Sequence, residues 1–317
     1  MAAETVLITG GCGFLGQHLA NELAGHGFRP VLFGNRERRH LLHPDLSPEN
    51  CPFARGDVLN LPELEAALAE HGAAGVIHAA AVVPPDSEAR PYHSIRVNLL
   101  GTLNVLEAVR RLGLGRLTMI SSGAVYAAAP ADAVEEAFFP PDLPYGFYGA
   151  AKASAEMIGL KYAGRYGLDF VSTRHGALYG PGGEGSPHYL YRLLLAAQAG
   201  RPVRLESGAD HRFEFVHVAD AARGVRLVHT APKLGHRIYN IGAGRDYRLA
   251  EVAELIKLYF PQAELELGPG PVSDLPQRRP FDISRAREVG YEPRWSLETG
   301  LADYLASMEK SRPGEKP

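Results

Sequence analysis

The stretch TVLITGGCGFLG (residues 5–16) joins a β-branched run to a glycine loop, and a helical pattern follows over residues 17–25. An apolar run of this kind is typical of a strand that is buried on both faces of a sheet. Glycines after a strand let backbone amides approach a pyrophosphate, and the N-terminus of the next helix adds a positive dipole. We therefore interpret the stretch as a phosphate cradle, with an ordinary glycine-rich turn as the alternative.

Strand-like and helix-like segments alternate along the chain as far as Gly176. Further strands are expected over residues 29–33, 75–81, 116–120 and 169–174, and helices over residues 61–70, 97–112 and 148–166. This alternation predicts an α/β protein with a doubly wound parallel sheet. We expect residues 1–175, with returning segments at about 213–242, to form a dinucleotide-binding domain. Residues 176–212 and 243–317 would form a smaller, discontinuous substrate-binding lobe.

The composition of the 317-residue chain is that of a packed globular protein, with 45% hydrophobic and 22% charged residues. Its net charge of −3 offers no basic surface for nucleic acid or an anionic membrane. No apolar run approaches the ~18 residues of a membrane span. The two cysteines, Cys12 and Cys51, cannot form a disulfide framework, which fits a reducing cytoplasm. No spacing of His, Cys or carboxylate residues predicts a metal site. Taken together, the composition, charge and cysteine content lead us to expect a cytoplasmic protein that acts on a small molecule.

The second strand ends in Gly34-Asn35-Arg36, at the place where an acidic side chain would hold an adenosine ribose 2′-hydroxyl. A guanidinium without that carboxylate favours a 2′-phosphate, and hence NADP over NAD as the cofactor. The alternative is that Arg36 belongs to a solvated charge run with Arg38 and Arg39, which leaves NAD open. After the third strand, Asp57 is a candidate acceptor for an adenine amine or an ordinary turn residue.

Tyr148 and Lys152 lie four residues apart, which places both side chains on one face of a helix. A phenol titrates near pH ~10, and an ammonium beside it favours the phenolate. The pair could therefore move a proton on and off a substrate hydroxyl, although this spacing also occurs by chance on surface helices.

Several motifs together resemble the extended short-chain dehydrogenase/reductase family, and within it the nucleotide-sugar epimerase/dehydratase branch. The similarity covers nearly the whole chain. Its motifs are the loop TGGCGFLG (residues 9–16), VNLLGT (97–102), SS (121–122), Y-x-x-x-K (148–152), LYGPG (178–182), FVHV (215–218) and YNIG (239–242). The resemblance implies a Rossmann-type sheet, a nicotinamide cofactor and a homodimer that is paired through the helices near Thr102 and Tyr148.

The resemblance also implies a Ser–Tyr–Lys site. Tyr148 would exchange the proton of a carbinol or ketone oxygen, Ser122 would hydrogen-bond the same oxygen, and Lys152 would hold the nicotinamide ribose and lower the tyrosine pKa. Ser121 is the neighbouring alternative to Ser122. The cofactor residues would be Gly10, Gly13, Phe14, Leu15, Gly16, Asn35, Arg36, Asp57, Val58, Ala79 and Asn98, together with Tyr148 and Lys152.

Departures from the family pattern narrow the reaction and open the question of the substrate. Gly123 and Ala124 stand where the family's dehydratases carry an acidic pair, so dehydration and decarboxylation are disfavoured. Epimerisation of a sugar, or net oxidation or reduction of a smaller polyol-like compound, remains. Ala177 replaces a family asparagine, and the usual diphosphate arginine is displaced by one place to Arg212. Arg278 and Arg279 could also substitute for it. Candidate substrate residues are Ser121, His175, His188 and Arg212.

Overall fold

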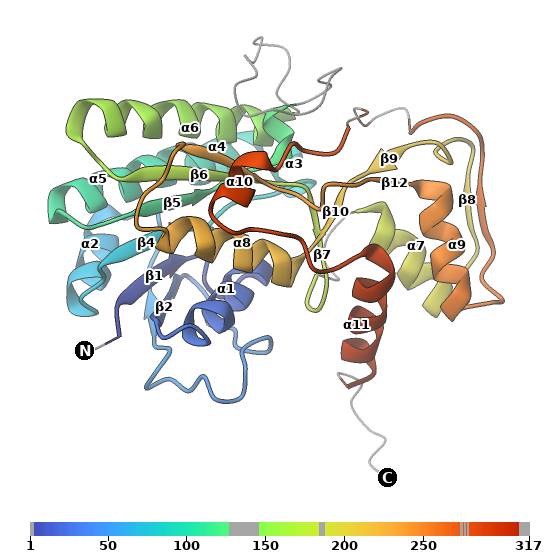
Figure 1. The fold of residues 1–317 in the computed structure, drawn as a ribbon, viewed down its shortest axis with the longest axis horizontal. Coiled ribbons are helices and arrows are strands. Elements are labelled where there is room, and N and C mark those ends of the chain that lie inside the picture. The colour runs from blue at the N-terminus through green and yellow to red at the C-terminus, as the bar shows by residue number, and fades with distance from the viewer. Residues whose placement is uncertain are drawn as a thin grey trace.

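The computed structural model describes residues 3–126, 146–183, 188–272, 275, 277 and 279–310. Within these residues, seven parallel strands form a central sheet in the order β11-β6-β5-β4-β1-β2-β3. The strands are β1 (Thr5–Thr9), β2 (Arg29–Gly34), β3 (Phe53–Arg55), β4 (Gly75–His78), β5 (Leu117–Ile120), β6 (Phe170–His175) and β11 (Ile238–Ile241) (Figure 1). The predicted doubly wound parallel sheet is confirmed.

Helices cover both faces of the sheet, which explains why its strands are apolar throughout (Figure 1). Leu7 and Ile8 are both fully buried but point to opposite faces, into two different core clusters. On one face lie α1 (Phe14–Ala24) and α8 (Val218–Thr230), and on the other lie α2 (Leu61–Glu70), α5 (Gly101–Leu112) and α6 (Gly146–Tyr166). The layered core holds the strand ends in place, and those ends carry most of the predicted site residues.

Strand β1 lies between β2 and β4, so the direction in which strands are added to the sheet reverses there. In open α/β sheets, ligands bind outside the carboxyl ends of the strands at such a switch point. The glycine loop follows β1 directly. The fold therefore brings this loop to the edge of the sheet where the residues after β4, β5 and β6 also gather.

The later part of the chain forms short strand pairs and helices beside the sheet (Figure 1). β7 (Ala177–Tyr179) pairs with β10 (Phe215–His217), β9 (Arg212–Phe213) with β12 (Tyr247–Arg248), and β8 (Val203–Leu205) with β13 (Leu265–Leu267). These pairs share a separate apolar core with α7 (Tyr189–Gln198), α9 (Leu249–Tyr259) and α11 (Leu297–Lys310). The short α10 (Ser284–Glu288) packs instead beside β11.

The helix expected over residues 97–112 is interrupted at its start. Two short helices, α3 (Asp86–Ala89) and α4 (Pro91–Ile95), lead into a π-helical turn, η1 (Arg96–Leu100), before α5 begins. Such turns often occur at functional sites, because the extra residue re-aims a side chain. Here the turn carries Asn98, whose amide is fully buried. A 3-10 turn, η2 (Gly123–Val125), likewise follows β5.

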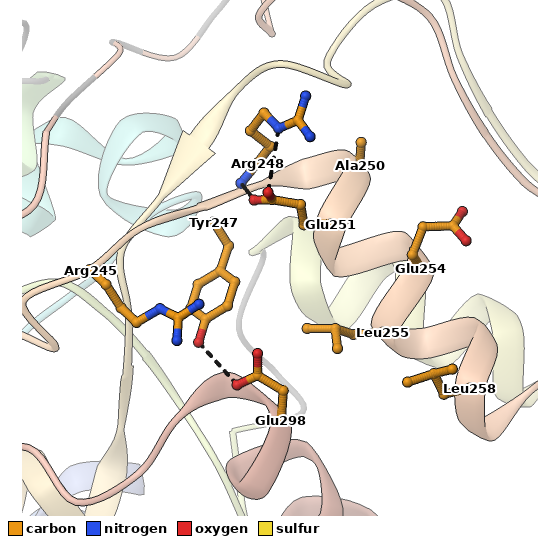
Figure 2. Close-up of a pocket in the computed structure, with 9 residues that line it drawn as sticks. All are labelled: Arg245, Tyr247, Arg248, Ala250, Glu251, Glu254, Leu255, Leu258 and Glu298. Carbon is orange, nitrogen blue, oxygen red and sulfur yellow. Dashed lines mark hydrogen bonds and ion pairs between the residues drawn. The ribbon is translucent and has the colours of Figure 1, made fainter.

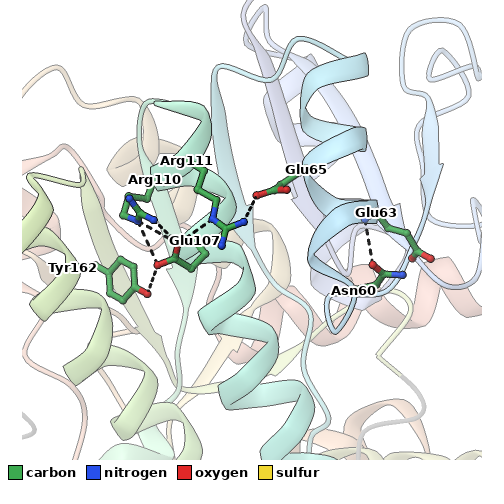
Figure 3. Close-up of polar contacts among 7 residues, drawn as sticks. All are labelled: Asn60, Glu63, Glu65, Glu107, Arg110, Arg111 and Tyr162. Carbon is green, nitrogen blue, oxygen red and sulfur yellow. Dashed lines mark hydrogen bonds and ion pairs between the residues drawn. The ribbon is translucent and has the colours of Figure 1, made fainter.

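A polar network joins the outer sides of α2, α5 and α6 (Figure 3). Glu107 accepts hydrogen bonds from Arg110, Arg111 and the Tyr162 hydroxyl, the last at 2.6 Å. Arg110 and Tyr162 hold the pKa of Glu107 at about 2. Arg111 also reaches Glu65 on α2. The network ties together helices that stand on one face of the sheet. None of the helices in the described part of the chain is both long and apolar enough to cross a membrane.

Candidate active site

The glycine loop is shaped by two glycines, Gly10 and Gly16, at which a side chain would not fit, and by Gly13 between them. Gly10 has φ +66°, and a Cβ there would lie 2.7 Å from the Ala80 backbone nitrogen. A Cβ on Gly16 would collide with the Gly10 carbonyl oxygen and lie 2.7 Å from that of Gly11. Gly13 is the N-cap residue of α1 and donates its own amide to the Gly10 carbonyl. The loop is thus folded tightly against the first turn of α1.

Within the described residues, the N-cap position of α1 is Gly13 and makes no side-chain capping hydrogen bond. Its first turn is Phe14-Leu15-Gly16, with the Leu15 side chain in the core and the Phe14 ring edge-on to His18. Backbone amides at an uncapped helix start attract anions. The cradle therefore fits the pyrophosphate of a dinucleotide, because glycines form the loop and the exposed N-cap residue Gly13 has no side chain to occupy the amides.

The predicted adenosine end of the site is more open. Asn35 and Arg36 are exposed after β2, and the Asn35 carbonyl accepts a hydrogen bond from Arg55. The Asp57 carboxylate accepts a hydrogen bond from the Leu59 amide, the contact of an ordinary turn residue. Val58 is buried beneath it. These residues gather at one edge, but their contacts leave both interpretations of Asp57 and Arg36 open.

Asn98 positions the segment that follows β4. Its side chain exchanges two hydrogen bonds of 2.8 Å with the backbone of Val82, one through its oxygen and one through its amide. Ala79, at the strand end, donates its amide to the Thr9 carbonyl. His78 is fully buried between the hydroxyls of Thr9 and Thr102. Both ring nitrogens of His78 are thus bonded inside the protein, and the residue packs in the core.

Lys152 is buried on α6 and directed at the end of β5. Its Nζ donates to the Ile120 carbonyl at 2.8 Å and lies 5.9 Å from the centroid of the Tyr148 ring. Burial lowers the pKa of Lys152 to about 8, although the Glu156 carboxylate one turn away raises it. Glu156 is itself held in a buried ion pair with Arg174, at 2.6 Å.

Tyr148 is half-buried and lies against Ser122. Its burial raises its pKa to about 12, and a hydrogen bond with the Ser122 side chain lowers the pKa without offsetting that effect. The expectation that Lys152 would bring the tyrosine pKa down is therefore not met by the protein alone. Desolvation of the phenolate raises the pKa by more than the Ser122 hydrogen bond lowers it, because water is displaced from the phenolic oxygen.

The two serines after β5 have different surroundings. The Ser122 hydroxyl accepts a hydrogen bond from the Ala124 amide at 3.1 Å and caps the 3-10 turn η2. The Ser121 hydroxyl is buried, and among the described residues it has no hydrogen-bond partner. Gly123 and Ala124 are buried inside the turn. Neither position supplies a carboxylate to the site.

The predicted substrate residues are spread over two parts of the molecule. His175 ends β6, where burial and the Lys152 charge lower its pKa to about 3. His188 is the N-cap residue of α7, and burial lowers its pKa to about 4. Arg212, in the lobe, donates to both oxygens of Asp246 at 2.8 and 3.0 Å. Arg278 lies outside the described residues.

The contact between Glu88 and the start of α6 was not predicted from the sequence. The Glu88 carboxylate accepts hydrogen bonds from the Phe147 and Tyr148 amides at 3.0 and 3.1 Å, and so caps α6 from a distant helix. Gly146 has φ +62°, and a Cβ there would lie 2.5 Å from the Glu88 carboxylate. The only sequence signal was Gly146 itself, two residues before the tyrosine.

A surface pocket of about 450 Å³ lies in the lobe (Figure 2). Tyr247, Arg248, Leu255 and Glu298 are among its lining residues, and the Tyr247 hydroxyl bonds to Glu298 at 3.1 Å. None of the residues predicted for catalysis or cofactor binding lines it. Within the described residues, no cluster of three or more His, Cys, Asp or Glu side chains could hold a metal ion.

The sequence pattern of the family described as "NAD dependent epimerase/dehydratase family" matches residues 6–242. A dTDP-glucose 4,6-dehydratase of Streptomyces niveus is 29% identical, with 98% of this chain and 95% of that protein covered. The crystal structure of Thermus thermophilus UDP-glucose 4-epimerase in complex with NAD has a TM-score of 0.83 and 28% identity, over 97% of this chain and 100% of that one.

A relative from Arabidopsis thaliana is a longer protein. It is a trifunctional UDP-glucose 4,6-dehydratase, UDP-4-keto-6-deoxy-D-glucose 3,5-epimerase and UDP-4-keto-L-rhamnose-reductase, 27% identical over 94% of this chain. The match covers 46% of that protein, so this chain spans about half its length.

Proposed function

The chain belongs to the NAD-dependent epimerase/dehydratase family, as its motifs predicted, and from this premise we propose that it epimerises a nucleotide sugar at one carbinol carbon. The observation that carries the proposal is the contact of Ser122 with Tyr148, with buried Lys152 beside them and no carboxylate at positions 123 and 124. Such a site can exchange an oxygen-bound proton. It lacks the acidic pair that an elimination of water would use.

The protein's own residues divide the work of proton exchange. Tyr148, with its pKa near 12, is protonated at neutral pH and is ready to donate to a carbonyl oxygen. Taking a proton from a hydroxyl requires that the Tyr148 phenolate be stabilised, which Ser122 does by hydrogen bonding. The Lys152 ammonium, 5.9 Å from the ring centroid, would add its charge to this once a ligand is bound. When bound, a nicotinamide cofactor supplies the exchange of hydride and a positive charge in its oxidised form. The cradle at Gly10, Gly13 and Gly16 would hold its pyrophosphate.

A second candidate function is net oxidation or reduction of a smaller hydroxy or keto compound. The observation that favours it is the bond between Arg212 and Asp246, because an arginine already held by a carboxylate is a weaker anchor for a diphosphate. Ala177 adds to this, since it offers no side-chain amide. We keep epimerisation first, with Ser121, His175, His188 and Arg212 as the proposed substrate contacts.

We propose NADP as the preferred cofactor within this NAD-dependent family. Arg36 is exposed beside Asn35 at the end of β2, and neither residue can repel a 2′-phosphate. Asp57 and Val58 would border the adenine, while Ala79 and Asn98 would line the path toward Tyr148. A guanidinium suits a phosphate group because it offers several donors.

We also propose that the protein is cytoplasmic and forms a homodimer. Nine large apolar side chains are exposed in the described residues, and six of them lie on α4, η1, α5 and α6: Tyr92, Leu100, Leu112, Phe147, Met157 and Tyr166. Gathering exposed apolar residues on neighbouring helices is typical of an interaction surface. Size-exclusion chromatography with light scattering tests this, and a monomer at high protein concentration would contradict it.

The decisive experiment follows the nicotinamide absorbance while purified protein and added NAD⁺ or NADP⁺ are incubated with UDP-glucose, dTDP-glucose or UDP-glucuronate. Epimerisation gives a new sugar without net absorbance change, whereas a dehydrogenase changes the absorbance in proportion to product. The Tyr148→Phe variant is expected to lose activity by about 10³-fold, since it removes the acid–base group. Retained turnover in that variant would overturn the assignment.

A further inference from the structure

His175 contains a buried nitrogen that no neighbour satisfies. The side chain is 4% exposed at the end of β6, and among the described residues its Nδ1 atom has no hydrogen-bond partner. Buried polar atoms are nearly always paired, so an orphan of this kind calls for an explanation. In a site built to bind a ligand, the missing partner can belong to that ligand.

The neighbouring Thr173 hydroxyl contacts the other ring nitrogen, Nε2, and bears on which nitrogen carries the proton. The Thr173 hydroxyl donates to the Met119 carbonyl at 3.4 Å, and the same oxygen lies 2.9 Å from Nε2 of His175. A hydroxyl has one proton, so when Thr173 donates that proton to the Met119 carbonyl, its oxygen accepts from Nε2–H, and the roles at this contact depend on that tautomer. Nδ1 of the neutral ring is then left with an unshared electron pair. Burial and the Lys152 charge lower the pKa of His175 to about 3, which keeps the ring neutral at physiological pH.

The register of the sheet places this nitrogen near the catalytic serine. Ile120 on β5 is paired with Thr173 on β6. Ser122 and His175 each lie two residues beyond that pair, so their side chains leave the sheet on the same face.

From these contacts we propose that Nδ1 of His175 accepts a hydrogen bond from an N–H or O–H group of the ligand bound at Tyr148 and Lys152. His175 would then be a specificity-determining residue and not a second acid or base. The inference rests on the proposed function for the identity of that site. Two donors share this chemistry: the carboxamide of the nicotinamide and a hydroxyl of the sugar.

Two substitutions separate the acceptor from the shape of the ring. His175→Phe keeps a planar ring and removes the acceptor, whereas His175→Asn places an amide oxygen close to the position of Nδ1. Thermal unfolding and far-ultraviolet circular dichroism check that both variants fold. Isothermal titration calorimetry then measures binding of NADH or NADPH, whichever the unaltered protein binds more tightly, and of UDP-glucose.

A carboxamide donor predicts that His175→Phe binds the cofactor about 10-fold more weakly, since a buried acceptor without a partner is costly. His175→Asn would bind within about threefold of the unaltered protein. The 3-acetylpyridine analogue, which has a methyl group in place of the carboxamide nitrogen, would bind the Phe variant and the unaltered protein equally. A sugar donor predicts unchanged cofactor affinity and the same pattern of loss and rescue for UDP-glucose.

Two results would overturn the proposal. One is that neither cofactor nor UDP-glucose affinity changes in His175→Phe, and the other is that His175→Asn fails as badly as the Phe variant. The binding measurements do not depend on turnover. A failure of the Ser–Tyr–Lys assignment would appear in Tyr148→Phe activity, so the two failures are distinguishable.

Discussion

The helices α1 and α6 begin at the same edge of the sheet (Figure 1). Their N-termini differ in whether a side chain caps them. The first turn of α1 follows a loop of glycines, and in the described part of the chain its N-cap residue Gly13 makes no side-chain capping bond. The first turn of α6 is capped by Glu88, whose carboxylate accepts from the Phe147 and Tyr148 amides. Both helix starts would attract an anion, but only α1 leaves its amides for one.

The two helix starts therefore have different roles, because α1 can bind a phosphate whereas α6 positions Tyr148. Free amides at α1 lose little when a phosphate binds, because no internal bond is broken. At α6 the protein's own carboxylate occupies the amides, so an external anion is excluded and the backbone of Tyr148 is held in place. Groups without a partner among the described residues, such as the Ser121 hydroxyl, mark where a ligand is expected. Groups already bonded mark what keeps the site in shape.

The largest expected effect on cofactor binding comes from closing the open helix start. Gly16→Ala would drive its methyl group into the Gly10 and Gly11 carbonyl oxygens, and the loop would have to shift away from the phosphate position. We expect cofactor affinity to fall by about 100-fold, corresponding to an overpacking cost of a few kcal/mol. Titration calorimetry with NADH and NADPH measures it.

The matched control is Gly164→Ala on α6, where a Cβ meets nothing within 4 Å beyond its own helix. That variant should bind the cofactor normally and be more stable by up to about 1 kcal/mol, because alanine is the better helix former. If Gly16→Ala folded and bound NADH as tightly as the control, the cradle interpretation of α1 would be wrong.

A second prediction extends the comparison to the exposed guanidinium after β2. Among the described residues, no hydrogen bond or ion pair of the Arg36 side chain is observed, so its donors resemble the open amides of α1. Arg36→Ala should weaken NADPH binding by about 10-fold, the value of one charge-assisted contact, and leave NADH binding within about twofold. Equal losses for both cofactors, or none, would favour NAD and a solvated role for Arg36.

The features that could be predicted from the sequence are those that local residue patterns determine. The strand, the glycines at positions 10, 13 and 16 and the helix after them follow from local patterns, and the sheet follows from their alternation. The family assignment was confirmed for the same reason, since its motifs lie on these elements. The roles of Ser122, Tyr148 and Lys152 remain predictions that the geometry supports.

What could not be predicted depends on contacts between distant residues. Glu88 lies about 60 positions before the helix that it caps, as the separations of 59 and 60 in its two bonds show. The tyrosine pKa was expected to fall, but its sign depends on burial, which only the folded chain determines. Asp246, which binds Arg212, is 34 residues away from it in the sequence. No local pattern encodes these pairings.

A third prediction concerns Arg212, whose charge is already paired with that of Asp246. Arg212→Ala should weaken UDP-glucose binding only by about threefold, because the guanidinium must share its donors with Asp246 and is partly exposed. Asp246→Ala should have the opposite effect and strengthen binding, since it releases the arginine. Calorimetry with UDP-glucose measures both. A loss above about 30-fold in Arg212→Ala would show a direct, dominant anchor instead.

The smallest expected effect comes from opening the capped helix start. Glu88→Ala frees the Phe147 and Tyr148 amides, and the loss of a cap of this kind lowers the free energy of unfolding by about 1 kcal/mol. Because the carboxylate acts on the backbone of Tyr148 and touches no substrate, we expect kcat to fall by about two- to threefold with KM unchanged. Glu88→Gln keeps an acceptor oxygen and should recover most of this loss. If Glu88→Ala raised KM and left kcat alone, the carboxylate would be part of the binding surface, and α6 would resemble α1 after all.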